Sequence, residues 1–492
     1  MSNMKRKILN IAAVVLFAGS VQAQQLDSYI TDIFNFSQLG LDGTASYVGR
    51  AGAIGALGGD FTAASYNPAG LGLFYTSQIS FTPSLNWVSD KSSYMGLNEK
   101  SNYVRFNISD LEALIAVPLK SEGWRAWQFG IGFNKLKNFN NRVYAEGDWT
   151  NTSLADAWVN EADADPDRLD PFGTAMAYDT WVIDTLSGGR TFFNNFAGHS
   201  NQLYQIEQLT ESGWENEMVL SFSGNYSDKL YIGATIGVPF LNYHRTEIYR
   251  ETAGTTDEYF DYTSDRDMSG TGINLKLGAI YRPVENLRIG LAFHTPTLYD
   301  IDEVYANSLY NYTLSRSYYA ESPEGASTFY FRTPLKLIGS VAVTLGNMSS
   351  PVAGSLDFDY EFTNYNGMAF RNGDEYETDL YYEAWKSNLN RVIDRTYQPA
   401  HTFRFGGTLN IKKFALRAGW AHTTNPYKEG TELDASSTML SAGVGFQSKV
   451  VFLDFAYANI SQKDEFTLID PTECLSVSRK NNIFVLTFGL KF

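Results

Sequence analysis

The sequence lacks the features that mark several large classes of protein. Its 492 residues include a single cysteine, Cys474, which excludes an intrachain disulfide framework. Beyond residue 23, no apolar run approaches the roughly 18 to 20 residues that a membrane-spanning helix needs, and this excludes an inner-membrane helical bundle. Acidic residues outnumber basic ones, 54 to 38, and the net charge of −16 argues against a nucleic-acid partner.

The N-terminus has the pattern of a secretory signal peptide. Three basic residues at positions 5–7 precede an apolar stretch at 8–18, and the small-residue pattern Val21-Gln22-Ala23 follows. We therefore predict a signal peptide over residues 1–23, with cleavage after Ala23. The chain is then destined for the periplasm, the outer membrane or the medium.

Composition favours the outer membrane among these destinations. The chain is 15% aromatic, with 33 Phe, 31 Tyr and 41 Gly, yet its apolar residues occur in short alternating segments. Aromatic girdles around a polar-lined barrel produce this mixture. One large closed sheet also accommodates the length better than several soluble domains, because no Pro/Ser-rich linker or low-complexity tract divides the chain.

The C-terminal segment shows the clearest strand pattern. Between residues 482 and 492, Phe484, Leu486, Phe488, Leu490 and Phe492 share one face of an extended chain, while smaller or polar residues share the other. One face suits lipid and the other suits a lumen. A strand that ends on an aromatic residue resembles the C-terminal signal of bacterial outer-membrane barrels.

The same alternation predicts about fourteen strands, with turn residues at their ends. Their ranges are 76–87, 103–118, 125–135, 216–226, 229–240, 271–282, 287–294, 329–346, 351–362, 399–411, 413–421, 436–447, 450–459 and 482–492. Tight turns alternate with long polar connections, as expected for short periplasmic turns and long extracellular loops. The longest and most acidic connection runs from Leu136 to Trp214. A soluble β-sandwich is the alternative, but its strands and loops are usually shorter.

The segment from 24 to 72 does not alternate and is dense in glycine and alanine. It includes Ala53–Asp60 and the sequence Asn67-Pro68-Ala69-Gly70-Leu71. Small side chains and tight backbone turns suit a plug packed inside a narrow lumen. The stretch Gly55–Gly59 has the composition of a dinucleotide loop, but the strand-turn-helix context of such a loop is missing.

With these motifs the chain resembles the FadL family of outer-membrane transporters for long-chain fatty acids and other hydrophobic compounds, most closely its Bacteroidetes branch. The resemblance implies an all-β fold, a transmembrane antiparallel barrel of about fourteen strands with an N-terminal plug, or hatch. It implies three parts: a signal peptide (1–23), the hatch (24–72), and the barrel with long extracellular loops (73–492). The expected partners are outer-membrane lipids, a hydrophobic ligand and the barrel assembly machinery.

The resemblance places Asn67, Pro68, Ala69, Gly70 and Leu71 in the hatch and on the ligand path. Pro68 fixes φ and lacks a donor, and Asn67 closes the turn through its side chain. The alternative is that this motif only ends the hatch and starts the first strand.

Charged residues of both signs fall at lumen-facing positions. They are Lys276, Arg288, Lys336, Asp357, Asp359, Glu361, Arg404, Arg417 and Asp454. One interpretation is that they brace the barrel and hold the plug through ion pairs between neighbouring strands. The other is that Arg404 and Arg417, on adjacent strands, bind the carboxylate of a ligand.

No pattern in the sequence indicates an enzyme, a cofactor or a metal site. The five histidines, His199, His244, His294, His401 and His422, fall in no nucleophile motif and are too scattered for a zinc or haem site. The acidic run Asp163–Asp167 does not fit an EF-hand loop, which leaves a looser surface calcium site or a solvated loop as alternatives.

We therefore expect passive transport across the cell outer membrane, driven by the burial of a hydrophobic cargo. Loop aromatics are the candidates for first contact: Trp158, Trp181, Phe192, Phe193 and Phe196. The alternative function is a surface shuttle or binding component of a type IX-like secretion pathway, because some proteins that resemble FadL serve in that role.

Overall fold

The computed structural model describes most of the chain. The described residues are 20–94, 97–150, 153–164, 167–186, 189–196, 203–253, 257–346, 351–373, 380–431, 433–467 and 474–492. Residues 1–19 of the predicted signal peptide lie outside them, and helix α2 (Ser20–Ser37) spans the predicted cleavage site. Within these ranges, no helix is both long and apolar enough to cross a bilayer.

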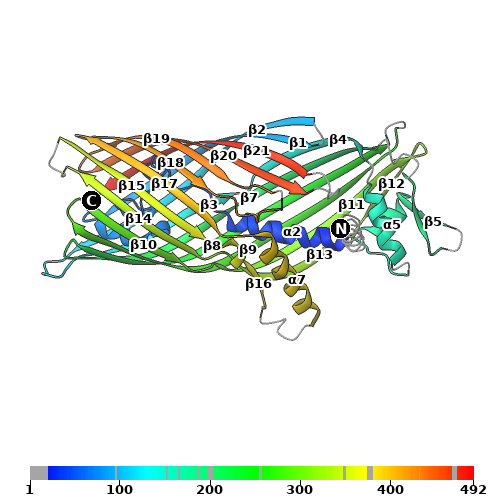
Figure 1. The fold of residues 1–492 in the computed structure, drawn as a ribbon, viewed down its shortest axis with the longest axis horizontal. Helices are drawn as coiled ribbons and strands as arrows, with labels where there is room; N and C mark the ends of the chain where they lie inside the picture. The colour runs from blue at the N-terminus through cyan, green and yellow to red at the C-terminus, as the bar shows by residue number, and fades with distance from the viewer. Residues whose placement is uncertain are drawn as a thin grey trace, which may run out of the picture.

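Fourteen antiparallel strands close into a barrel, as predicted (Figure 1). Each strand is hydrogen-bonded to the next, and the last pairs with the first. In order around the barrel they are β1 (Gln78–Tyr94), β2 (Leu97–Pro118), β3 (Trp124–Asn138), β7 (Leu203–Tyr226), β8 (Leu230–Ala253), β9 (Tyr259–Val284), β10 (Leu287–His294), β14 (Lys336–Leu345), β15 (Val352–Thr363), β17 (Ala400–Ile411), β18 (Phe414–Thr423), β19 (Ser437–Gln447), β20 (Val451–Thr467) and β21 (Cys474–Lys491).

The alternation within the strands sorts apolar side chains outward and polar ones inward. In β21, Leu486 and Phe488 are 42% and 47% exposed, whereas Val485 and Thr487 are buried. The predicted faces of this strand are therefore correct. Each of the fourteen barrel strands carries exposed apolar side chains on its outer face, which is typical of a surface that faces lipid.

Several sequence-based expectations about strand bounds were wrong, and two of them change the topology. The segment 329–346 is not one strand, because β13 (Gly325–Arg332) ends before Pro334 and β14 begins at Lys336. Proline has no N–H to continue a ladder, and the two pieces pair with different neighbours. The connection 136–214 is not entirely a loop either, because it contains β4 (Asn141–Thr150) and the first half of β7.

One end of the barrel has short turns and the other has long connections. We call them the short-turn end and the long-loop end; they lie on the left and right of Figure 1. At the long-loop end, β11 (Leu298–Thr313) extends the wall by pairing with β9, and β12 (Arg316–Glu321) and β13 pair with β11 in turn. The wall of the barrel therefore continues beyond the apolar band, by which we mean the part of the outer surface that carries the exposed apolar side chains.

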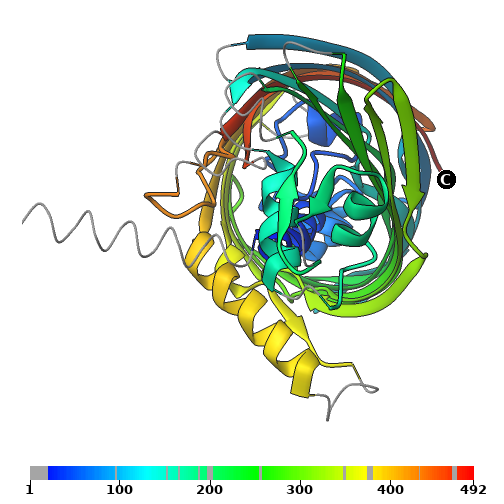
Figure 2. The same cartoon turned by 90° about the vertical axis from the view of Figure 1, so that its right-hand side faces the viewer.

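The segment before β1 lies inside the barrel (Figures 1 and 2). We call residues 28–73 the inner segment. After α2 it contains α3 (Ala45–Val48), α4 (Ala63–Tyr66) and the 3₁₀ helix η1 (Pro68–Leu73). Helix α3 contacts β19, β20 and β21, whereas η1 contacts β7, β8 and β9, so the inner segment reaches opposite sides of the wall.

The connection between β4 and β7 folds over the long-loop end. We call its described residues between 153 and 196 the cap. It contains α5 (Leu154–Ala164), α6 (Thr174–Asp179) and the small hairpin β5 (Ile183–Thr185) and β6 (Phe192–Asn194). Viewed from this end, the cap lies within the outline of the barrel (Figure 2).

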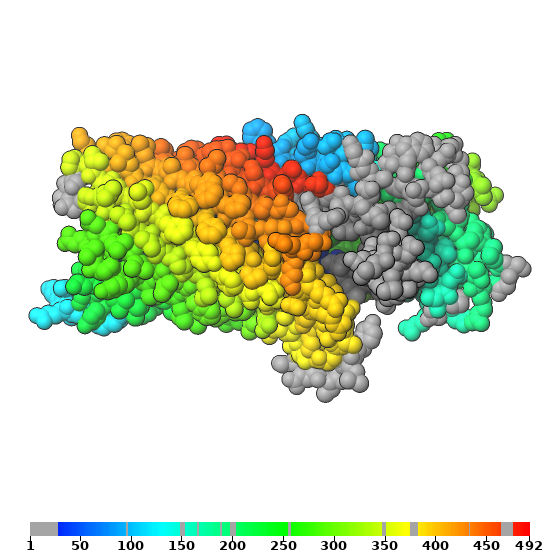
Figure 3. Space-filling view, in the orientation of Figure 1, coloured from blue at the N-terminus to red at the C-terminus, as the bar shows by residue number. Residues whose placement is uncertain are grey.

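A third module stands at the side of the barrel. It comprises η3 (Tyr365–Gly367), β16 (Ala369–Arg371) and α7 (Leu380–Thr396). Strand β16 pairs with β13, and the region around α7 projects from the wall in the space-filling view (Figure 3). Buried apolar side chains of this module and of α2 belong to one hydrophobic core at the long-loop end.

Candidate functional site

The sequence Asn67-Pro68-Ala69-Gly70-Leu71 forms a tight, fully buried turn. The side-chain Oδ1 of Asn67 accepts a hydrogen bond from the Ala69 amide (3.2 Å) and caps η1, while its Nδ2 donates to the Gly55 carbonyl (2.6 Å). Pro68 occupies the first turn of η1, where a missing N–H costs nothing. Asn67 thus connects two passes of the inner segment to each other.

Glycines in the wall make room for this turn. A Cβ at Gly278 of β9 would lie 2.0 Å from Asn67 Oδ1, and one at Gly233 of β8 would lie 2.4 Å from the Pro68 carbonyl carbon. A Cβ at Gly419 of β18 would likewise lie 2.3 Å from the Arg50 carbonyl carbon. Only glycine allows the inner segment to approach the strands so closely.

Arg404 and Arg417 lie in two separate ion pairs. Arg404 contacts Glu361 (2.9 Å) and the Tyr66 hydroxyl (3.0 Å), whereas Arg417 contacts Asp454 (2.5 Å). In the register of the two strands Arg404 lies opposite Ala421, four positions from Arg417, which corresponds to roughly 13 Å along the strand. The two guanidinium groups therefore do not converge on one ligand carboxylate.

Other inward charges hold the inner segment to the wall. Asp359 Oδ2 accepts hydrogen bonds from the amides of Ile54 (3.0 Å) and Gly55 (2.9 Å). Arg288 donates to the Leu57 carbonyl (2.5 Å), and Thr487 Oγ1 accepts from the Ala45 amide (2.8 Å). The inner segment is thus anchored through its backbone on several sides of the lumen.

Helix α2 is fixed at the long-loop end by charge and by aromatic packing. Asp32 is 1% exposed and contacts Arg266 (2.8 Å) and Arg245 (3.7 Å). Burial raises the pKa of Asp32, and the two arginines oppose that shift. Arg266 also contacts Glu303 (2.6 Å), which accepts a hydrogen bond from Tyr29 (2.6 Å).

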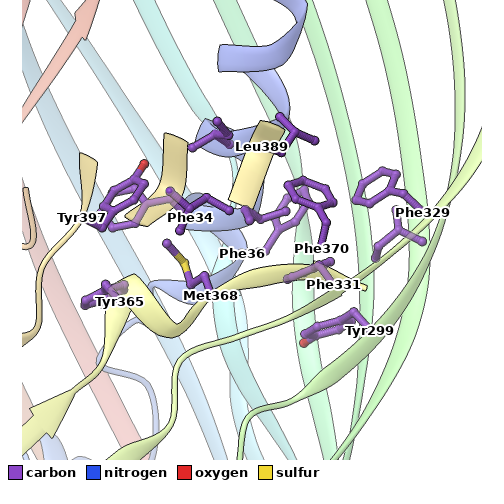
Figure 4. Packing of buried hydrophobic residues seen from close by; sticks show 14 of the residues in the cluster. Phe34, Phe36, Tyr299, Phe329, Phe331, Tyr365, Met368, Phe370, Leu389 and Tyr397 are labelled. Atoms are coloured by element: carbon purple, nitrogen blue, oxygen red, sulfur yellow. The ribbon is translucent and has the colours of Figure 1, made fainter. Parts of the chain in front are cut away.

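The aromatic part of this anchor lies between α2 and the side module (Figure 4). Phe34 stacks on Tyr397 with ring centroids 4.6 Å apart, and Phe36 contacts Tyr243 at 5.2 Å. Burial of one such ring stabilises the fold by about 1.5–3 kcal/mol. These contacts keep α2 inside the barrel.

A chamber of about 1730 Å³ lies between the inner segment and the cap. The apolar lining side chains gather on one flank, formed by α2, the side module and the segments from β17 to β21, where Arg404, Arg479 and Asn481 also lie. The apolar residues of this flank are Phe34, Tyr365, Val392, Tyr397, Ala400, Tyr427, Leu433, Ala435, Met439, Ile460 and Ile483. The opposite flank, from β2, β3, β7, β8 and β9, is rich in charged and amide side chains. The chamber is larger than the usual 300–1,000 Å³ of a small-molecule pocket.

The wall of the barrel is interrupted beside this chamber. Strand β2 pairs with β3 only over Asp110–Pro118. Among the described pairings, residues 97–109 of β2 bond only to β1, and residues 135–138 of β3 bond only to β7. We call these two unpaired stretches the wall break. Strand β4 pairs with β7 and leaves the edge of β2 open.

Side chains replace the missing ladder at the wall break. Arg105 Nη1 donates to Asn138 Oδ1 (3.1 Å), Asn138 Nδ2 donates to Asn107 Oδ1 (2.8 Å), and the Lys135 ammonium also contacts Asn107. Arg105, Lys135 and Asn138 line the chamber. On the outer face of the same stretch, Val104 and Phe106 are 62% and 71% exposed.

The cap closes the chamber at the long-loop end. Glu251 of β8 binds the start of α5 through Ser153 Oγ (2.5 Å) and the Leu154 amide (3.3 Å). Trp158, Phe192 and Phe196 are at most 6% exposed, because they form the apolar core between the cap and the wall. Their predicted role in first contact with a ligand is therefore wrong. Trp181 is 50% exposed.

The described histidines have four different environments. His244 contacts Asp267, His294 contacts the Tyr66 carbonyl, His401 contacts Tyr360, and His422 contacts Thr438. His199 lies outside the described residues. In the part of the chain that the structure describes, no three His, Cys, Asp or Glu side chains gather as a metal site.

The acidic run that we weighed as a surface calcium site is engaged within the cap. Asp163 Oδ1 accepts a hydrogen bond from the Phe192 amide (2.7 Å), and Asp167 contacts Arg190. Residues 165 and 166 lie outside the described residues. The described carboxylates of this run thus hold the β5–β6 hairpin to α5.

Comparison with known proteins identifies the fold. No family model and no curated protein matches the chain. Among solved structures, a Pseudomonas aeruginosa FadL homologue matches with 13% identity and a TM-score of 0.54, over 92% of this chain and 99% of that one. The P. putida toluene transporter TodX gives 13% and 0.51 over the same shares. The CymD monoaromatic hydrocarbon channel gives 11% and 0.50, over 92% and 98%. The likeness confirms the predicted FadL-type fold, and the chain shares the barrel of these three proteins.

Proposed function

We propose that this protein is a passive conduit of the outer membrane for hydrophobic small molecules. The observation that carries the proposal is the chamber, which is enclosed by the inner segment and the cap and reaches the wall break at Arg105 and Asn138. The fold is shared with a protein described as a toluene transporter and another described as a monoaromatic hydrocarbon channel. In this arrangement the long-loop end faces the medium and the short-turn end faces the periplasm.

The inner segment acts as a hatch in this proposal. Its contacts with β7 to β9 on one side and β19 to β21 on the other support this role, because a segment that spans the lumen would obstruct a straight path along the barrel axis. A hydrophobic solute therefore needs another exit from the chamber. Asn67 to Leu71 hold the hatch in place, and Arg404 and Arg417 brace it and the wall.

The wall break provides that exit. Unpaired backbone edges are costly in lipid, so an interruption of the ladder in a barrel is retained where it lines a cavity. The Arg105 and Asn107 bridges to β3 are side-chain contacts, and they open more readily than a continuous ladder. Val104 and Phe106 then offer an apolar surface on the membrane side.

Burial provides the driving force, at about 25 cal/mol for each Å² of apolar surface removed from water. The apolar flank of the chamber, with Tyr397, Tyr427 and Met439, accepts the apolar part of the solute. Transfer through the wall break then moves the solute from this flank into lipid without exposing it to water. No energy-coupling step is required.

Uptake in a clean deletion strain tests the proposal. We expect slower uptake of a radiolabelled long-chain fatty acid or of an aromatic hydrocarbon, restored by the wild-type gene. Unchanged uptake of both, together with altered surface delivery of secreted proteins, would favour the shuttle of a type IX-like pathway instead. Mass spectrometry of the lipid extract from the purified barrel then identifies the cargo.

A further inference from the structure

Six of the nine Lys and Arg side chains that line the chamber are paired with a carboxylate. In each pair the side-chain nitrogen and the carboxylate oxygen lie within 4.0 Å of each other. The paired basic residues are Arg245, Arg266, Lys276, Lys336, Arg404 and Arg479. Lys137 instead donates a hydrogen bond to Asn35 Oδ1 of α2 (2.6 Å). Arg105 and Lys135 form no ion pair within 4.0 Å with any described carboxylate. Both lie at the wall break.

Hydrogen-bond donors outnumber acceptors at this place. Arg105 uses Nη1 for Asn138, and its guanidinium lies 4.2 Å from the Tyr103 ring centroid. Its Nε and Nη2 are buried and have no acceptor, and the same holds for Nδ2 of Asn107. Lys135 is 7% exposed, and its ammonium donates a hydrogen bond to the side-chain carbonyl oxygen of Asn107.

One carboxylate of the inner segment offsets part of this positive charge. Asp42 accepts a hydrogen bond from Ser109 (2.9 Å) and attracts Lys135 electrostatically, although the two described side chains do not approach within the 4.0 Å of an ion pair. One carboxylate does not balance two cations, so buried Lys135 and half-buried Arg105, whose Nε and Nη2 are unused, remain costly unless a further anion compensates them. A group with several acceptor oxygens supplies both the charge and the hydrogen bonds.

We propose that Arg105, Lys135 and Asn107 form a binding site for the phosphate or sulfate head of an amphiphile at the wall break. The head lies between the unpaired parts of β2 and β3, and the apolar tail follows either the chamber or the outer surface at Val104 and Phe106. The site deepens the proposed function and rests on it, because it assigns an anionic class of ligand to the exit. The head belongs to a solute in transit or to a lipid of the surrounding membrane.

Binding of matched amphiphiles tests the site. The purified protein in phosphatidylcholine nanodiscs is titrated with dodecyl phosphate and with dodecanol by isothermal calorimetry. We expect dodecyl phosphate to bind at least about tenfold more tightly, since hydrogen bonds to charged groups are the stronger class. Arg105→Gln and Lys135→Gln each remove most of this preference, and Arg105→Lys retains part of it.

Arg250→Gln is the control, because Arg250 already pairs with Asp261 (2.6 Å) at the long-loop end. We expect it to bind both amphiphiles as the wild type does. Heat-modifiable migration on gels shows that each variant has folded. Equal affinities for dodecyl phosphate and dodecanol in the wild type overturn the anion site and leave the conduit intact. Failure to bind either amphiphile, with no uptake defect in the deletion strain, overturns the conduit itself.

Native mass spectrometry separates the two sources of the head. A phosphate-bearing lipid that stays on the wild type through purification, and is lost from Arg105→Gln, identifies a membrane lipid. A lipid-free wild type that takes up one equivalent of dodecyl phosphate identifies a solute in transit. Retention of the same lipid by wild type and Arg105→Gln, with equal dodecyl phosphate affinity, contradicts the site.

Discussion

Gly278→Ala tests whether the wall positions the inner segment. The new methyl group would lie 2.0 Å from Asn67 Oδ1 and 2.9 Å from the Ala69 amide nitrogen, so the turn must move. Overpacking of this kind costs about 1–3 kcal/mol, and loss of the Asn67 cap costs about 1 kcal/mol more. A net loss of about 2 kcal/mol raises the population of the displaced inner segment by about thirtyfold.

Single-channel recording in planar bilayers measures this displacement as more frequent opening to ions. Gly339→Ala is the matched control, since a Cβ there meets no atom within 4 Å and the variant should behave as the wild type. If Gly278→Ala and Gly339→Ala give the same conductance and the same thermal unfolding as the wild type, the close packing of Asn67 against β9 does not hold the inner segment.

Three further predictions follow from the same contacts. Deleting residues 24–72 should leave a barrel that conducts ions steadily, because about fourteen strands enclose a wide lumen; an assembled but silent barrel would contradict the hatch. Leu486→Arg, on the lipid face, should destabilise the barrel by about 2–4 kcal/mol in urea titrations in liposomes, whereas Leu314→Arg, 81% exposed at the long-loop end, should cost nearly nothing. Burial and then the nearby Asp170 raise the pKa of Glu161 in α5 to about 7, above its ordinary value of 4.5. The folded cap therefore favours the protonated carboxyl of Glu161. The stability that this proton adds to the cap is fully present below pH 4.5 and is lost as the pH rises through about 7. Hydrogen exchange of residues 154–164 should show this pH dependence in the wild type but not in Glu161→Gln.

The sequence predicts most of the barrel because lipid and lumen impose opposite chemistry on alternate residues. Leu486 and Thr487 show the rule clearly, and the fourteen strands appear close to their predicted positions. The rule fails beyond the apolar band, where both faces of a strand meet water or polar groups. The sequence pattern therefore predicts loops at 203–213 and 241–253, whereas in the structure these stretches belong to β7 and β8.

The site was only partly predictable for a similar reason. Sequence placed Arg404 and Arg417 on adjacent strands, but their register and their partners Glu361 and Asp454 depend on tertiary packing. The wall break leaves no local signal, because it consists of missing pairing between strands whose own patterns are regular. The inward glycines are an exception, since Gly233 and Gly278 interrupt bulky strands at lumen-facing positions and could have indicated the seat of the Asn67 turn.

The most direct test of the account is to close the wall break reversibly. Asn107→Cys and Asn138→Cys replace two side chains whose amides are 2.8 Å apart, in a chain whose own Cys474 is changed to Ser. A short bis-methanethiosulfonate reagent then links the two strands, and the single-cysteine variants serve as controls. We predict that the linked protein still binds a labelled hydrophobic solute in its chamber but no longer supports uptake, and that a reducing agent restores uptake. Full uptake by the linked protein would contradict the exit through the wall break.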